Sequence, residues 1–103
     1  AKNADENSER IKERVLAARE VQWQRQGKCN ALLSVAELES VAALLPSGET
    51  MLNKVMTKFN LSARVYHRII KLARTLADLE GVVQVTEKHL SEALHFRCLD
   101  RIR

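Results

Sequence analysis

The sequence predicts an all-α fold, a single compact bundle of about five helices. Apolar residues recur at steps of three and four along several segments, which is the period of an α-helix. The chain has only three glycines and one proline, too few for an architecture rich in β-turns. Its 103 residues, 46% hydrophobic and 29% charged, suit one domain with one core.

The first predicted helix begins with Asn7 or Ser8 as its amino-terminal cap and ends at Gly27. Residues 1–7 are small and polar, so we expect a frayed segment there, followed by a helical domain over residues 8–103. Within the helix, Ile11, Val15 and Ala18 lie on one side. Residues 28–33 are expected to form a connector.

Two shorter helices are predicted next. Ser34 and Glu37 have the spacing of a capping box, in which each side chain binds the other residue's backbone amide, and they start the second helix. The segment at Pro46 breaks the chain, because the residue before proline avoids the α conformation. Ser47 is the expected cap of a third helix that ends near Asn60.

The fourth and fifth helices have the clearest signals. The fourth begins at Asn60 or Ser62, ends at Gly81 and carries an apolar stripe of Leu61, Val65, Ile69, Leu72, Leu76 and Leu79. Residues 82–85 are expected to be a packed connector. Thr86 starts the fifth helix, which is expected to reach Leu99 or Asp100.

Composition limits the classes of function. A net charge of +4 permits contact with phosphates, but acidic residues are interspersed with the basic ones, so a mixed solvated surface fits as well. No apolar run approaches 18 residues, so no membrane partner is expected. Neither CxxC nor HxxxH spacing occurs, so no metal site is predicted, and the two cysteines are expected to be reduced in a cytoplasmic protein.

Three segments together resemble the C-terminal domain of the magnesium-chelatase-like AAA+ proteins, a family that includes competence proteins. They are Arg14-Val15-x-x-Ala18-Arg19-x-x-Gln22, Leu61-Ser62-Ala63-Arg64-x-Tyr66-His67-Arg68-Ile69, and Val85-Thr86-x-x-His89-Leu90-x-Glu92-Ala93-Leu94. The resemblance runs along nearly the whole chain. It implies that the chain is the helical lid that follows an ATPase core.

The same resemblance implies a role for Arg64, which falls on the position of the family's sensor-2 arginine. There it would contact the γ-phosphate of ATP, and in this branch of AAA+ proteins the contact is expected in trans, in the site of a neighbouring subunit. The implied cofactors are ATP and Mg²⁺ in a larger parent protein. The implied partners are the parent's own AAA+ core, neighbouring subunits of a hexameric ring, and DNA, on which the parent would drive branch migration during natural transformation.

Residue chemistry alone leaves the role of these cations open. Arg64 lies near the start of a helix, where a guanidinium beside free backbone amides can hold a phosphate, but an exposed surface arginine has the same pattern. Arg68 and Lys71 extend a basic strip on the same helix and could contact phosphate or DNA, or form salt links. No catalytic residue is predicted, since Tyr66 and His67 lack a nearby nucleophile or carboxylate in sequence.

The sequence contains no GxxxxGK[ST] loop and no strand ending in acidic residues, so we expect no enzyme activity from this chain by itself. It is interpreted as a fragment of an ATPase. The alternatives are a stand-alone helical DNA-binding module, or a protein-interaction module that uses Trp23 and Val21.

Overall fold

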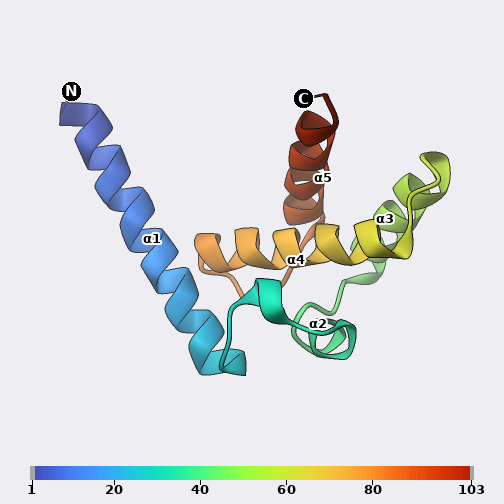
Figure 1. The fold of residues 1–103 in the computed structure, drawn as a ribbon, viewed down its shortest axis with the longest axis horizontal. Coiled ribbons are helices and arrows are strands. Elements are labelled where there is room, and N and C mark those ends of the chain that lie inside the picture. Colours follow the sequence, from blue (N-terminus) through green and yellow to red (C-terminus); the bar gives the residue numbers. More distant parts are fainter. Residues whose placement is uncertain (1, 103) are drawn as a thin grey trace.

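A computed structural model describes the backbone of residues 2–102 and the side chains of residues 8–96. Its elements, in order, are α1 Lys2–Gln26, the short 3₁₀ turn η1 Asn30–Leu32, α2 Val35–Val41, α3 Pro46–Lys58, α4 Ala63–Glu80 and α5 Glu87–Ile102 (Figure 1). Residues 2–102 contain no strand. The predicted all-α fold with five helices is therefore confirmed.

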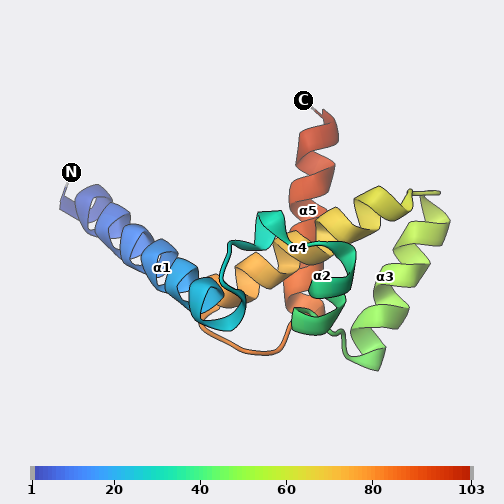
Figure 2. The same ribbon diagram turned by 60° about the horizontal axis from the view of Figure 1, so that its bottom comes forward.

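Helix α4 is the centre of the fold. Its most extensive packing is with α5, which crosses it at a steep angle (Figure 1), and α1, α2 and η1 also contact it. The carboxyl end of α1 meets the carboxyl end of α4, and the rest of α1 extends away from the body (Figures 1 and 2). Helix α3 packs on α5 at the other side. As a result, the amino-terminal end of α4 lies beside α3, far from the contact with α1.

The core lies where α2, α3 and α5 meet α4. Its fully buried members include Leu38, Leu52, Ile69, Leu90 and Val85. The buried face of α4 also contains Ala73 and Ala77, each with no exposed surface, and such small side chains let neighbouring helices approach closely. The predicted leucine stripe is one flank of this face, because Leu72 and Leu76 are only half-buried.

Three helix starts agree with the sequence, and two of them have a capping side chain. The Ser34 hydroxyl accepts from the backbone of Glu37 at 3.2 Å, and the Glu37 carboxylate accepts from the backbone of Ser34 at 2.9 Å. Ser62 caps α4 by accepting from the amide of Val65 at 3.4 Å. Thr86 precedes α5, and its carbonyl accepts from the amide of Leu90.

Other predicted boundaries are wrong. Helix α1 begins at Lys2 and not at a cap at Asn7 or Ser8, because no glycine or proline between these positions stops the helix. Helix α3 begins with Pro46 in its first turn and not after Ser47, since proline needs no amide partner there. Helix α5 reaches Ile102, beyond the expected end at Leu99 or Asp100.

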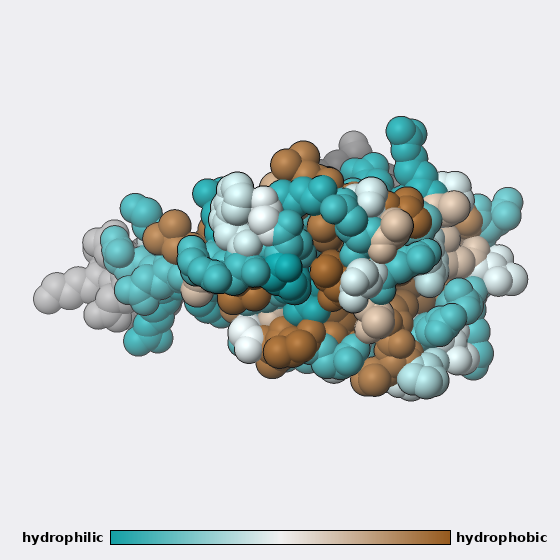
Figure 3. All heavy atoms as spheres, turned by 90° about the horizontal axis from the view of Figure 1, so that it is seen from below, coloured by the Kyte–Doolittle hydropathy of each residue, from teal (hydrophilic) through white to brown (hydrophobic). Residues whose placement is uncertain are grey.

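Large apolar side chains remain exposed on the described surface. Trp23 is 63% exposed on α1, and Val83, after α4, is 90% exposed. In a view of the lower face, apolar surface lies between polar areas over the body of the molecule (Figure 3). No helix in the described part of the chain is long and apolar enough to cross a membrane.

Candidate functional site

Arg64 is the second residue of α4. Ser62 caps this helix, and Ala63 is its first residue. It is exposed and belongs to no ion pair or side-chain hydrogen bond among the residues whose side chains are described. The amides of a helix's first turn have no partner within the helix, and together with the macrodipole they favour an anion. An anion held there would lie within reach of the free guanidinium.

The two other predicted cations lie along the same helix. Arg68 is exposed one turn after Arg64, and Lys71 is half-buried. The Lys71 ammonium donates to the carbonyl of Ala31 at 3.2 Å, a contact that ties α4 to η1. Arg68 and Lys71 line one shallow hollow with Thr75. The structure thus brings Arg68 and Lys71 together, with Arg64 beyond them at the helix start.

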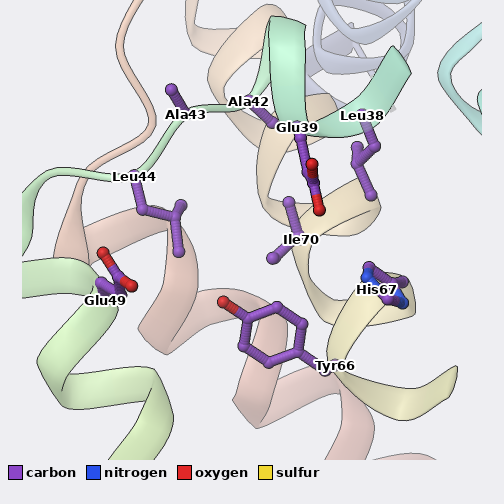
Figure 4. Close-up of a pocket in the computed structure, with 9 residues that line it drawn as sticks. All are labelled: Leu38, Glu39, Ala42, Ala43, Leu44, Glu49, Tyr66, His67 and Ile70. Atoms are coloured by element: carbon purple, nitrogen blue, oxygen red, sulfur yellow. The ribbon is translucent and has the colours of Figure 1, made fainter. Parts of the chain in front are cut away.

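Tyr66 and His67 lie on the side of α4 that faces α2 and α3. Their rings meet edge to face, with centroids 5.5 Å apart. They line a hollow of about 230 Å³ with Glu39 of α2 and Glu49 of α3 (Figure 4). Burial, followed by the charges of Glu49 and Glu39, raises the pKa of Tyr66. The sequence could not show that these two carboxylates face the aromatic pair.

A buried polar cluster joins the carboxyl ends of α1 and α4, and sequence reasoning missed it. The Asp78 carboxylate accepts from Arg25 at 2.9 Å and from the Asn30 amide at 2.9 Å. It also pairs with Arg74 at 2.9 Å. Arg74 is 3% exposed and donates to the carbonyls of Val82, at 2.9 Å, and of Val83. Only the four-residue spacing of Arg74 and Asp78 hinted at this cluster.

Burial and hydrogen bonding in this cluster shift the pKa of Asp78 and the pKa of Arg74. Burial would raise the pKa of Asp78, but the hydrogen bonds from Arg25 and Asn30 and the charge of Arg74 outweigh it and lower that pKa. Burial lowers the pKa of Arg74 despite the opposing charge of Asp78. The Arg74 Nε is buried without a hydrogen-bond partner among the described residues. Apart from this nitrogen, the polar groups of Arg74 and Asp78 bind within the cluster or to backbone carbonyls, so the cluster is a structural joint that connects α1 and α4.

His89 forms a second polar joint, at the start of α5. Its Nδ1 accepts from the backbone amide of Thr86 at 3.0 Å, and its Nε2 lies 3.2 Å from the carboxylate of Glu80. Because Nδ1 accepts, the hydrogen-bond network assigns the ring proton to Nε2. Hydrogen bonds from Lys88 and then His89 lower the pKa of Glu80. In the part of the chain with described side chains, no three candidate ligands gather as a metal site.

Comparison with known proteins matches this sequence to one family. Residues 5–97 match the family described as magnesium chelatase, subunit ChlI C-terminal. The chain is 43% identical over 97 residues to the competence protein ComM of Haemophilus influenzae. It is 38% identical over 97 residues to each of the YifB proteins of Salmonella typhimurium and Escherichia coli.

These matches cover 94% of this chain but 19% of each relative, so the chain spans about a fifth of the length of the relatives it matches. The family match covers Arg64, Arg68 and Lys71 as well as the buried joint between α1 and α4. The chain therefore belongs to the family of C-terminal domains of the magnesium chelatase subunit ChlI.

Proposed function

We propose that this domain is the helical lid of an AAA+ ATPase and that Arg64 is its sensor-2 arginine, contacting the γ-phosphate of ATP. The observation that carries the proposal is an exposed guanidinium with no ionic partner among the described side chains, in the first turn of the helix at the centre of the fold. Family membership and the position of Arg64 within the matched residues support it.

The residues present fit the phosphate part of a nucleotide. Arg64 supplies a forked donor, and the first-turn amides of α4 supply a positive electrostatic potential. When bound in the parent, ATP with its Mg²⁺ supplies the phosphoryl group that is transferred to water. The domain's own part is to hold Arg64 outward on a helix fixed by α2, α3 and α5, so that movement of the lid moves the guanidinium.

Substitution of Arg64 in the parent protein tests the role directly. We expect Arg64→Ala to lower the ATP turnover rate about a hundredfold, because one preorganised donor to the developing charge is lost. Arg64→Lys is expected to recover only part of the rate, since an ammonium lacks the planar fork. Arg10→Ala, at an exposed arginine of α1, is the matched control and should keep the wild-type rate. Wild-type turnover by Arg64→Ala would refute the assignment.

Mixed rings test whether Arg64 acts on the site of a neighbouring subunit. Subunits with Arg64→Ala and an intact nucleotide-binding loop are mixed with subunits that have Arg64 but a disabled loop. If the arginine acts in trans, the mixture hydrolyses ATP faster than either variant alone. If mixing restores no activity, the arginine serves its own subunit.

For the parent we propose a ring-forming ATPase that acts on DNA, driving branch migration during natural transformation. The similarity to a protein named as a competence protein supports this proposal. An assay of the parent on a synthetic four-way junction should show ATP-dependent strand exchange that Arg64→Ala slows in proportion to hydrolysis. If the parent hydrolyses ATP but never moves a junction, another remodelling task, such as metal insertion, replaces this one.

A further inference from the structure

The hollow beside Tyr66 and His67 has the features of a receptor for one cationic side chain. Its floor is apolar, formed by Leu38, Ala42 and Ile70, each less than 10% exposed. Its rim carries two carboxylates, Glu39 on α2 and Glu49 on α3. In Figure 4 the Glu39 carboxylate points into the hollow and the Tyr66 hydroxyl points toward Glu49.

The polar groups around this hollow are free to bind. Neither Glu39 nor Glu49 forms a salt bridge with any described side chain. The Tyr66 hydroxyl likewise makes no hydrogen bond within the described part of the chain, although the ring is half-buried. Two unpaired carboxylates on a domain with a net charge of +4 create a local negative potential against the overall sign. That potential selects a cation.

The size of the hollow decides what kind of cation fits. At about 230 Å³ it is smaller than the roughly 300–1,000 Å³ typical of small-molecule sites, so it suits one side chain rather than a cofactor. An apolar floor accepts an aliphatic stem, and an aromatic face beside it attracts a guanidinium. Two carboxylates on separate helices can accept hydrogen bonds from different edges of a planar guanidinium. The ammonium group of lysine has no such planar arrangement of donors.

We propose that the hollow formed by Glu39, Glu49, Tyr66 and His67 binds an arginine side chain presented by a partner protein. The arginine stem lies on Leu38 and Ile70, and the guanidinium lies between the two carboxylates against the Tyr66 ring. This site is separate from Arg64 and does not depend on the role proposed for that residue.

A peptide titration of the 103-residue chain tests the site. Tyr66 is the single tyrosine, so its ring signals in a proton NMR spectrum belong to this hollow without ambiguity. The probe is N-acetyl-Gly-Arg-Gly-amide, and the matched probes replace arginine with neutral citrulline or with lysine. We expect saturable shifts of the Tyr66 and His67 signals with arginine, at a dissociation constant on the order of 1 mM. Citrulline should cause no saturable shift.

Charge-removing variants make the test specific. Glu39→Gln and Glu49→Gln should each weaken the arginine peptide at least threefold, and the double variant about tenfold, given a loss of ~1.4 kcal/mol per tenfold. Glu9→Gln removes the same charge from an exposed position on α1 and should leave affinity unchanged. Circular dichroism confirms that each variant is folded.

Three results would overturn the proposal. Equal shifts with citrulline would show that charge plays no part, and equal affinity for lysine would remove the assignment to arginine. If Glu9→Gln weakened binding as much as Glu39→Gln does, the effect would come from overall charge and not from this site. None of these results bears on Arg64, so the lid function stands or falls separately.

Discussion

Asp78 is the residue on which the joint between α1 and α4 depends. Its side chain is 1% exposed and pairs with two guanidinium groups, one from Arg25 and one from the buried Arg74. Taking charges out of water is costly, and the cost is offset only while the partners remain together. The loss of Asp78 would leave the Arg74 charge buried beside backbone carbonyls alone.

We therefore predict that Asp78→Ala lowers the free energy of unfolding by about 3–5 kcal/mol, the usual cost of breaking a buried ion pair. Lys28→Ala is the matched control, because it breaks the surface pair with Glu37 and should cost less than about 1 kcal/mol. Urea unfolding followed by circular dichroism measures both. A cost for Asp78→Ala no greater than that of Lys28→Ala would mean that the cluster adds no stability.

The lowered pKa of Asp78 also predicts acid sensitivity. A carboxyl group whose folded pKa lies below its unfolded value of about 3.8 binds fewer protons in the folded state, so its contribution is present above pH 3.8 and is lost as the pH falls through the folded pKa. Glu37, with a pKa of about 2, acts in the same direction. The urea concentration at the unfolding midpoint of the wild type should be lower at pH 2.5 than at pH 5. The decrease should be larger for the wild type than for Asp78→Ala. Parallel pH profiles would exclude Asp78 as a source of this dependence.

At the scale of the elements, the sequence predicted correctly those helix starts that a capping side chain close in the chain determines. Ser34 and Ser62 cap their helices through side chains only three residues from their targets, so a short motif was enough. The start of α3 has no side-chain cap, and the extension of α1 to Lys2 reflects only the absence of a stop signal. The start of α3 is marked instead by Pro46 in its first turn, whereas the start of α1 has no local signature.

Features formed within one helix could be predicted from the sequence, whereas features that join several helices could not. The exposure of Arg64 follows from its place in the first turn of one helix, which sequence predicted. The hollow beside Tyr66 needs Glu39 and Glu49 from two other helices, and the buried joint needs Arg25, 53 residues away from Asp78. Contacts between residues so far apart in the chain depend on how the helices pack, and local patterns in one sequence do not show which helices lie side by side.

Gly81 ends α4 in the left-handed conformation, with φ at 82°, and so directs the chain toward α5. No neighbouring atom would meet a Cβ there, so a substitution changes only the backbone energy. We predict that Gly81→Ala lowers the free energy of unfolding by about 1–2 kcal/mol, and that Gly81→Asn costs less because asparagine tolerates this conformation. Urea unfolding of both variants measures the difference. Equal stability of Gly81→Ala and wild type would show that the turn relaxes to another conformation.

At the scale of the whole molecule, a basic strip on α4 is separate from an acidic hollow between α4, α2 and α3. The basic strip of Arg64, Arg68 and Lys71 lies along the helix, whereas Glu39 and Glu49 face it from α2 and α3 across the Tyr66 hollow. A lid that offers one arginine to a nucleotide needs no broad basic face. A stand-alone DNA-binding module does, because each phosphate contact needs its own cation. The two functions therefore predict different salt dependences for the same chain.

If duplex DNA contacts only the basic strip, about three phosphates are neutralised and the slope of log affinity against log salt is about −2.7. Raising the salt from 50 to 200 mM should then weaken binding about 40-fold, and Arg68→Ala should make the slope shallower by about one. Arg10→Ala, on α1 away from the strip, is the control and should leave the slope unchanged. Fluorescence anisotropy with a labelled duplex gives these slopes. A slope steeper than about −5 requires cations from several helices, and such a surface would favour the DNA-binding module over the lid.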